Sequence, residues 1–341
     1  MSGENDEQTI ETAAGIIKNG GLVAMPTETV YGLAANALDE SAVASIFAAK
    51  DRPADNPLIL HICDMGILND IAENIPDTAL RLAEKFWPGP LTMILKRKSN
   101  IPAICSAGLD TVAVRFPSNP VATALIKAAG VPLAAPSANC SGRPSPTKAE
   151  HVISDLSGRI DAVIDGGECH VGLESTVISL TGGVPKILRP GGVTLEQITD
   201  VIGVAEMDDA VLKPLEPGNH PNSPGMKYTH YAPRTTVMLC EGDSESFAEY
   251  ANDQFERHKD VCVLCPEELL EKIAAPGLPL GRLDDAAAQC HGLFAALRDI
   301  DSLGSTVCYA YAPGKQGLSL AVYNRLLRAS GFHVLQIGGA Q

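Results

Sequence analysis

The sequence lacks the features that place a chain in a membrane or bind it broadly to nucleic acid. No segment approaches the ~18 uninterrupted apolar residues of a membrane span. The first residues include Glu4, Asp6 and Glu7 and no apolar run, so we expect no secretory signal peptide. The sequence has no Lys/Arg tract, and 26 Lys and Arg stand against 41 Asp and Glu, for a net charge of −15. Because broad nucleic-acid binding needs many phosphate-facing cations, we expect a cytoplasmic protein with weak direct RNA binding. A local cationic pocket for one small anion is still allowed.

The cysteines form neither a disulfide framework nor a metal-binding pattern. There are nine, an odd number, and most stand singly in apolar runs. This predicts reduced, buried thiols in a reducing compartment. Cys262 and Cys265 form one C-x-x-C, but a structural zinc site needs a second pair. We interpret these two as thiols of a buried strand and expect no metal bound by the protein.

Helix and strand patterns divide the chain into two α/β parts and a linker. Over residues 1–205 the elements do not alternate strictly, which favours a mixed sheet. Residues 206–235 are rich in Pro and Gly yet hold Tyr228 and Tyr231, so we interpret them as an ordered linker that lies against another part of the protein. Strands and helices then alternate over 236–341, which predicts a smaller Rossmann-like domain without G-x-G-x-x-G. Its expected helices are 244–257, 267–275, 285–300 and 320–330.

Polar residues of the first part gather at expected strand ends and in the loops after them, where α/β sheets bind ligands. One cluster, "PTETVYG", follows the strand at 22–25, and a simple turn would explain it equally well. A second, "KDRPADNPLILH", places Lys50 and Arg52 at a helix C-terminus, where the dipole favours cations in any case. That explanation does not account for Asn56 and His61, although a lone His is more often structural.

Three further clusters point to anions. Arg115 lies inside the apolar strand "TVAVRFP", and a buried Arg without an anion is costly, so either it reaches an edge of the fold or, as we favour, it holds a carboxylate or phosphate. The loop "APSANCSGRPSPT" offers hydroxyls and backbone N–H groups that suit an anion-binding nest. Arg189 ends a strand just before Pro190, and an Arg at such an edge often holds a phosphate or carboxylate.

Together these clusters bring cations and hydroxyls into an otherwise acidic protein. The cations are Lys50, Arg52, Arg115, Arg143 and Arg189. The sequence has no Walker P-loop, no Cys/His/Asp metal cluster and no recognisable Ser-His-Asp arrangement. The implied chemistry is the positioning and charge neutralisation of anions, as in phosphoryl or nucleotidyl transfer.

These motifs, taken in order, resemble a known family. "PTETVYGL", "KDRPADNPLILH", "FWPGPLT", "VAVRFP", "PSANCSGRPSPT", "GLESTV" and "ILRPGG" are similar to the YrdC-like domain of L-threonylcarbamoyladenylate synthases. "SPGMKYTHYAP" and the part that follows resemble the two-domain branch of that family. The resemblance covers essentially the whole chain, and the combination is specific although each motif alone is weak.

The resemblance implies a nucleotidyltransferase that condenses L-threonine, bicarbonate or CO2 and ATP to threonylcarbamoyl-AMP and pyrophosphate. The product would serve tRNA threonylcarbamoyladenosine modification, completed by a separate transferase. The family's K-x-R and S-x-N signature implies a catalytic role for Lys50, Arg52, Ser137 and Asn139. Threonine would be held by Thr29, His61, Arg115, Ala135 and Ser175. ATP would be held by Arg52, Asn56, Thr111, Ser137, Ser145, Arg189 and Tyr231. The linker 206–235 would then act as a lid over the active site, with Tyr231 over the nucleotide.

The resemblance also leaves questions open. Many relatives carry an acidic residue after "STV", where this chain has Ser179, so a charge or metal role there is in doubt. Mg²⁺ is expected to accompany ATP, with no protein ligand that can be named. Two alternative functions stay open: a carbamoyltransferase of the same domain family and an RNA-binding module, the latter disfavoured by the negative charge.

Overall fold

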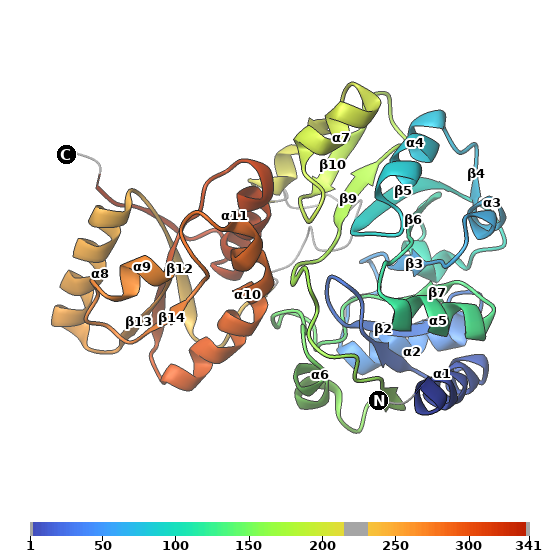
Figure 1. Cartoon of the computed structure of the whole chain (residues 1–341), viewed down its shortest axis with the longest axis horizontal. Helices are drawn as coiled ribbons and strands as arrows, with labels where there is room; N and C mark the ends of the chain where they lie inside the picture. Colours follow the sequence, from blue (N-terminus) through green and yellow to red (C-terminus); the bar gives the residue numbers. More distant parts are fainter. Residues whose placement is uncertain (1–2, 215–230, 339–341) are drawn as a thin grey trace. The chain divides into compact units, whose positions relative to one another are not determined.

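The computed structural model describes residues 3–214 and 231–338, which divide into two units. Of these, 3–141 and 145–211 belong to the first unit, and 142–144, 212–214 and 231–338 belong to the second. Each unit has its own sheet flanked by helices (Figure 1), which confirms the predicted fold class. The domain limits at residues 205 and 235 stay a prediction, and residues 215–230 of the predicted lid lie outside the described residues. None of the helices within the described ranges is long and apolar enough to cross a membrane.

The first unit contains most of the helices expected from the sequence, with small shifts at their ends. They are α1 (Gly3–Lys18), α2 (Glu40–Lys50), α3 (Leu68–Ile71), α4 (Asp77–Phe86), α5 (Pro120–Ala129), α6 (Ala149–Leu156) and α7 (Leu195–Ile202). Asp39 caps α2, as a side-chain acceptor at this position should. The strands are β1 (Val23–Met25), β2 (Gly32–Asn36), β3 (Ile59–His61), β4 (Ala72–Glu73), β5 (Leu91–Arg97), β6 (Thr111–Arg115), β7 (Leu133–Ala134), β8 (Ala162–Val163), β9 (Thr176–Ser179), β10 (Lys186–Arg189) and β11 (Glu206–Met207).

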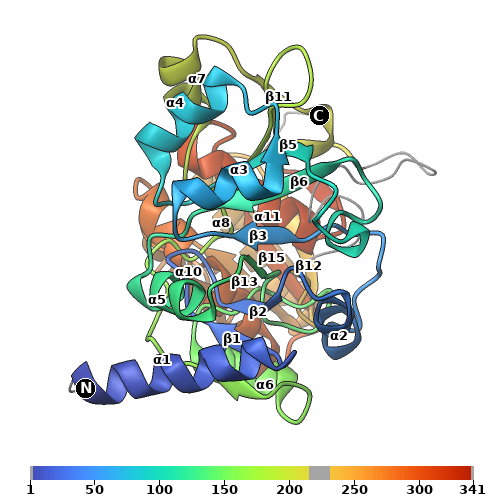
Figure 2. The same cartoon turned by 90° about the vertical axis from the view of Figure 1, so that its right-hand side faces the viewer.

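These strands form one mixed sheet in the order β11-β10-β9-β5-β6-β3-β7-β2-β1-β8, with β4 paired to β5. Figure 2 shows β5, β6, β3, β2 and β1 in this order from top to bottom. β3 and β6 run parallel with His61 opposite Arg115, and β5 runs antiparallel to β6 with Thr92 opposite Arg115. Three polar residues from three strands therefore meet side by side.

The main core lies on one face of this sheet. Alternate residues of a strand point to opposite faces. Leu60 of β3 and Val114 of β6 belong to the core that includes residues of α2, α4 and α7. The larger part of the apolar surface of the unit is buried on this face.

The opposite face is divided between a second core and polar residues. α1 and α5 cover β1, β2 and β7, and Leu133 of β7 is part of this second core. His61 pairs with Leu133 and therefore points to the same face. Arg115 and Thr92 point to this face as well, because Arg115 lies opposite His61 and Thr92 lies opposite Arg115. This face thus changes from packed core over β7 to a mixed surface over β3, β6 and β5, where a small apolar cluster that includes Ile59, Ala113 and Ile94 lies beside the polar side chains.

The strand β2 was not predicted, because "GLAAN" lacks the β-branched and aromatic residues that favour strands. Its neighbours β1 and β7 hold it in place through backbone pairing on both sides. Tertiary context, and not local propensity, makes this segment a strand.

The second unit is a five-stranded parallel sheet with the order β14-β13-β15-β12-β16. Its elements are β12 (Thr236–Glu241), α8 (Ser244–His258), β13 (Val261–Cys265), α9 (Glu267–Leu270), β14 (Gly277–Pro279), α10 (Ala286–Asp299), β15 (Val307–Tyr311), α11 (Gly317–Ala329) and β16 (Val334–Gln336). Figure 1 shows α8 on one side of the sheet and α10 and α11 on the other. This is the arrangement expected of a doubly wound domain.

Two details of the second unit differ from expectation. The helix predicted over 267–275 ends at Leu270, and the chain continues in tighter turns, in which Lys272 N donates to Leu269 O and Ile273 N donates to Leu270 O. The chain instead returns as β14, an edge strand that tolerates Pro279. The C-x-x-C thiols of Cys262 and Cys265 are buried in β13, and all nine cysteines are free.

Gly191 holds the end of β10 against the start of β9. A Cβ at this position would lie 2.4 Å from Thr176 N and 2.6 Å from Glu174 O. Both are backbone atoms, which cannot move aside as a flexible side chain would. The glycine is therefore required by close backbone approach, beside Ser175 and Arg189.

We predict that Gly191→Ala lowers the free energy of unfolding of the first unit by about 2–3 kcal/mol, because the added methyl overpacks a rigid backbone contact. Gly182→Ala is the matched control, since nothing lies within 4 Å of its Cβ. Urea unfolding is followed by the fluorescence of Trp87, the single tryptophan, which is buried in this unit. Equal stability of the two variants would contradict this account.

Candidate active site

Arg115 at the end of β6 is the centre of the first polar group of the site. Only 3% of its surface is exposed. Its Nη1 donates to Thr29 Oγ1 at 2.8 Å, its Nε donates to Gly89 O at 3.4 Å, and its Nη2 lies 2.7 Å from Glu28 Oε1. The guanidinium thus joins three segments that are distant in sequence, and Glu28 balances its charge.

Ser175 links this group to Arg189. Its Oγ lies 2.7 Å from Thr92 Oγ1, and Thr92 pairs with Arg115 across β5 and β6. Arg189 donates from Nη2 to Ser175 O at 2.9 Å and to Ser175 Oγ at 3.2 Å. The residue predicted for threonine, Ser175, therefore touches one predicted for ATP, Arg189.

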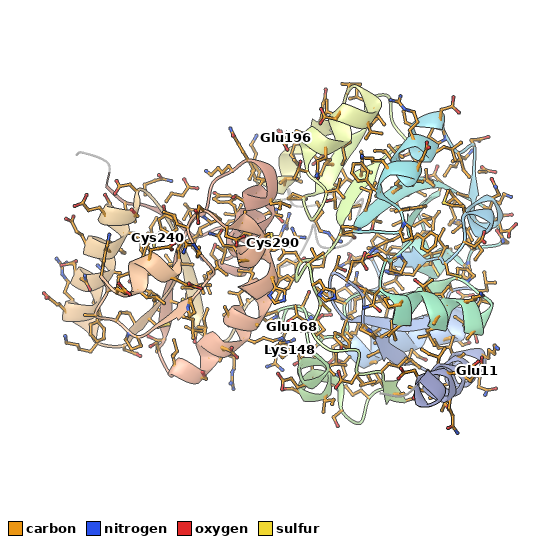
Figure 3. All side chains as sticks on the ribbon, in the orientation of Figure 1. Glu11, Lys148, Glu168, Glu196, Cys240 and Cys290 are labelled. Carbon is orange, nitrogen blue, oxygen red and sulfur yellow. The ribbon has the colours of Figure 1, made fainter. Side chains whose placement is uncertain are left out.

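Ser145 and Thr147 extend the group along the loop that follows β7. Ser145 Oγ donates to Glu174 Oε1 at 2.5 Å, next to Ser175 in the chain. Thr147 is fully buried, and its Oγ1 has no hydrogen-bond partner in the described structure. An ion pair of 3.7 Å between Lys148 and Glu168 lies beside this loop (Figure 3).

Lys50 organises a second polar group. Its Nζ donates to Ser137 O and to Asn139 O, each at 2.5 Å, and its backbone carbonyl accepts from Ser141 N. Burial, with the charge of Arg52 as a second cause, lowers the pKa of Lys50 well below its ordinary value. The buried amine therefore fixes the S-x-N loop onto the end of α2, a role that the sequence did not predict.

Arg52 and Asn56 lie next to this clamp. Arg52 Nη2 donates to Pro57 O at 3.1 Å and to Asn56 O at 3.3 Å. The side chain of Asn56 is 1% exposed, and its Oδ1 accepts no hydrogen bond from the described residues. A buried acceptor without a donor costs about 1–3 kcal/mol, so it is a candidate for contact with a ligand.

The loop after β1 connects the two polar groups. Tyr31 O accepts from Ala138 N at 2.8 Å, next to the Lys50 clamp. Thr29 Oγ1 accepts from Arg115 in the other group. Thr27 Oγ1 donates to Val30 O at 2.7 Å and so fixes the turn between them. "PTETVYG" is thus a turn, as the simpler interpretation held, and it contributes side chains to the first group and a backbone carbonyl to the second.

His61 is a buried, neutral part of the site. Burial, helped by the charge of Arg115, lowers its pKa to about 3. Its Nδ1 lies 3.2 Å from Ile59 O. At physiological pH the imidazole carries no charge, so it contributes hydrogen bonding and shape to the site.

The predicted substrate residues lie toward opposite ends of two parallel strands. Asn56 precedes β3 and Thr111 begins β6, whereas His61 and Arg115 end them. Four residues of strand, about 13 Å, separate Thr111 from Arg115. Ile59 and Ala113 lie between these ends in a small apolar cluster, so the predicted substrate residues lie on either side of it and do not form one continuous polar surface.

Three predicted residues stand apart from these contacts. Ala135 contributes its backbone, since its N donates to Ile59 O at 3.0 Å. Arg143 lies in the segment 142–144, which belongs to the second unit. Tyr231 also belongs to the second unit, where its ring lies 5.0 Å from that of Phe294 and 5.8 Å below Arg325 Cζ.

Sequence reasoning gave no role to Glu28, Thr92 and Glu174, which the structure places in the first polar group. All three stand inside motifs that were quoted for other residues. Thr92 alternates with apolar neighbours in β5, and this spacing marks it for the face shared with Arg115. Within the ranges that the structure describes, no group of three or more His, Cys, Asp or Glu residues could hold a metal ion.

Two family models match consecutive parts of the chain. The model described as "Telomere recombination", which unites Sua5, YciO and YrdC sequences, matches residues 15–191. The model described as "Threonylcarbamoyl-AMP synthase, C-terminal domain" matches residues 193–331.

Curated proteins and solved structures resemble the chain over nearly its full length. Threonylcarbamoyl-AMP synthase of Pyrococcus abyssi is 45% identical over 97% of both chains. The Bacillus subtilis protein of the same name is 44% identical over 97% of this chain and 95% of its own. The crystal structure of P. abyssi Sua5 complexed with L-threonine superimposes with a TM-score of 0.91 at 46% identity, covering 97% of each chain.

The pKa of His61 predicts a specific pH dependence of stability. The folded protein does not protonate this ring until about pH 3, whereas the unfolded chain does so near pH 6.5. Unfolding therefore takes up a proton between these values, and stability falls with acid by up to about 1.4 kcal/mol per pH unit. His61→Gln has no imidazole that takes up a proton on unfolding. The free energy of unfolding of the wild type should therefore fall by about 2 kcal/mol more than that of the variant between pH 6.5 and 5.0. Urea unfolding followed by Trp87 fluorescence measures the free energy of unfolding of both proteins. A difference between them that does not change with pH would show that His61 has an ordinary pKa in the folded protein.

Proposed function

This chain belongs to the Sua5/YrdC family of threonylcarbamoyl-AMP synthases, and from that premise we propose that it condenses L-threonine, bicarbonate or CO2 and ATP to threonylcarbamoyl-AMP and pyrophosphate. As a member of that family it is a nucleotidyl-transferring enzyme. The observation that carries the proposal is the buried contact between Ser175 and Arg189 beside Arg115. It brings a residue assigned to the amino acid against one assigned to the nucleotide, where the two substrates must meet.

The first polar group is suited to the amino acid. Arg115 has five N–H donors in a planar fork that matches a carboxylate. Thr29 and Ser175 provide hydroxyls beside it, and the neutral His61 shares its face of the sheet. Ala135 borders this group through its backbone. A buried cation and hydroxyl groups together suit the carboxylate and the hydroxyl of a small polar amino acid such as threonine.

The second polar group is suited to the nucleotide. Arg52 lies beside the S-x-N loop, whose conformation Lys50 fixes. The backbone N–H groups of Ala138, Asn139 and Ser141 donate within the protein, so this loop would meet the phosphates with its hydroxyl and amide side chains. Asn56 and Thr147 each keep a buried polar atom without a partner among the described residues. We assign phosphate contacts to Arg52, Ser137, Asn139, Ser145 and Arg189, and nucleotide contacts to Asn56 and Thr111.

The reaction then follows from positioning. The amine of threonine takes up CO2 to form a carbamate, whose oxygen attacks the α-phosphate while pyrophosphate leaves. Negative charge increases on the α-phosphoryl oxygens, and we assign its stabilisation to Arg52 directly and to Lys50 through the S-x-N loop that its amine fixes. A lid would protect the labile adenylate from water, and we assign this role to residues 206–235 with Tyr231 over the nucleotide.

Other parts of the proposal concern the setting of the enzyme. Mg²⁺ is expected to arrive on the phosphates of ATP, and no step is assigned to a protein ligand for it. The nine free cysteines support a reducing, cytoplasmic location. The product would pass to a tRNA-modifying transferase, and the net charge of −15 disfavours strong direct binding of RNA.

We predict that the protein releases pyrophosphate only when ATP, L-threonine and bicarbonate are all present. Arg52→Ala and Lys50→Ala should each lower this rate by about 10²–10³-fold, as removal of one group that stabilises transition-state charge does elsewhere. Lys85→Ala is the control, because Lys85 is exposed in the last turn of α4. Trp87 fluorescence verifies folding. Release that does not depend on threonine would refute the proposed function, and near-normal rates in both variants would refute the assigned roles.

A further inference from the structure

Glu28 is a buried carboxylate in the site to which the family resemblance gives no role. It lies in the turn after β1, and 6% of its surface is exposed. Its backbone carbonyl accepts from Val171 N at 2.7 Å, and Thr27 Oγ1 bonds to the backbone of the same turn. The peptide that carries Glu28 is therefore held rigidly, and its side chain is directed at Arg115.

The contact between Glu28 and Arg115 is close but incompletely bonded. Glu28 Oε1 lies 2.7 Å from Arg115 Nη2. Nevertheless, neither Glu28 oxygen accepts a hydrogen bond of good geometry from the described residues, and Arg115 Nη2 donates none. Buried charged groups left in this condition cost free energy that a ligand can recover.

The unused groups match the charges of an α-amino acid. Arg115 offers donors to a carboxylate, and Glu28 Oε2 offers an acceptor to an ammonium group. In a free amino acid the ammonium and carboxylate groups are attached to the same carbon atom and are therefore close together. Glu28 and Arg115 are equally close to each other here, so one amino acid can contact both. Binding the zwitterion adds no net charge to the buried site. Two charge-assisted contacts, one to each charged group of the ligand, offset the cost of removing these groups from water.

We propose that Glu28 Oε2 accepts a hydrogen bond from the α-ammonium group of the bound amino acid while Arg115 binds its carboxylate. This inference rests on the proposed function and assigns Glu28 to the amino-acid site. The site is then selective for α-amino acids over hydroxy acids of the same shape. The rival is that Glu28 merely orients Arg115.

The affinities of three ligands separate these roles, measured by calorimetry on the full chain. L-threonine has an amine and a hydroxyl, L-2-aminobutanoate lacks the hydroxyl, and 3-hydroxybutanoate lacks the amine. Glu28→Gln should weaken the two amines by the same factor, about 10–100-fold, which is the range for a hydrogen bond to a charged group. Affinity for 3-hydroxybutanoate should change by less than about 2-fold. Glu84→Gln, at an exposed carboxylate of α4, is the matched control.

Each other outcome overturns a defined part of the account. Equal losses for all three ligands would show that Glu28 acts only through Arg115, and a loss confined to the two hydroxyl ligands would place it on the hydroxyl. Either result leaves the proposed function intact, whereas wild-type protein that binds no L-threonine refutes both. If Glu28→Gln does not fold, as Trp87 fluorescence would show, Glu28→Asp is measured in the same way. Glu28→Asp keeps the negative charge, but its side chain is shorter by one methylene group, so the carboxylate lies farther from the ligand. We expect the same selective loss of affinity for the two ligands that carry an amine.

Discussion

The buried guanidinium of Arg115 is the interaction on which the first unit's polar surface depends. It contacts the turn after β1 through Glu28 and Thr29, and the turn before β5 through Gly89 O. A cation at this depth is tolerated only when charge and hydrogen bonds compensate for its lost hydration. The contacts that compensate Arg115 also hold three segments that are distant in the sequence next to one another. The interactions that stabilise the buried arginine therefore also position the residues of the site.

The sheet gives this arrangement its place. On one face, β3, β5 and β6 contribute apolar residues to the main core, and the intervening residues point to the opposite face. Over β1, β2 and β7 that opposite face is covered by α1 and α5. Over β3, β5 and β6 it carries His61, Thr92 and Arg115 beside a small apolar cluster. The alternation of the strands thus turns one sheet into both a core and the floor of a site.

The sequence was sufficient to predict the family and the mixed α/β class, both of which are confirmed. Elements with strong local patterns, such as the helices α8 and α10, were predicted correctly to within a residue at each end. β2 was missed because pairing with two neighbours makes it a strand. The clamp from Lys50 to Ser137 and Asn139 was also missed, since no local pattern reveals which backbone carbonyls a distant lysine will meet. The ligand roles of the individual site residues stay predictions.

The central claim is that the carbon of bicarbonate is joined both to the amine of threonine and to AMP. Mass spectrometry of a reaction with ¹³C-bicarbonate, ATP and L-threonine tests it most directly. The account predicts threonylcarbamoyl-AMP that is heavier by one mass unit than the product made from unlabelled bicarbonate, together with pyrophosphate. Cleavage of ATP that yields AMP and pyrophosphate without a labelled threonine adduct would contradict it.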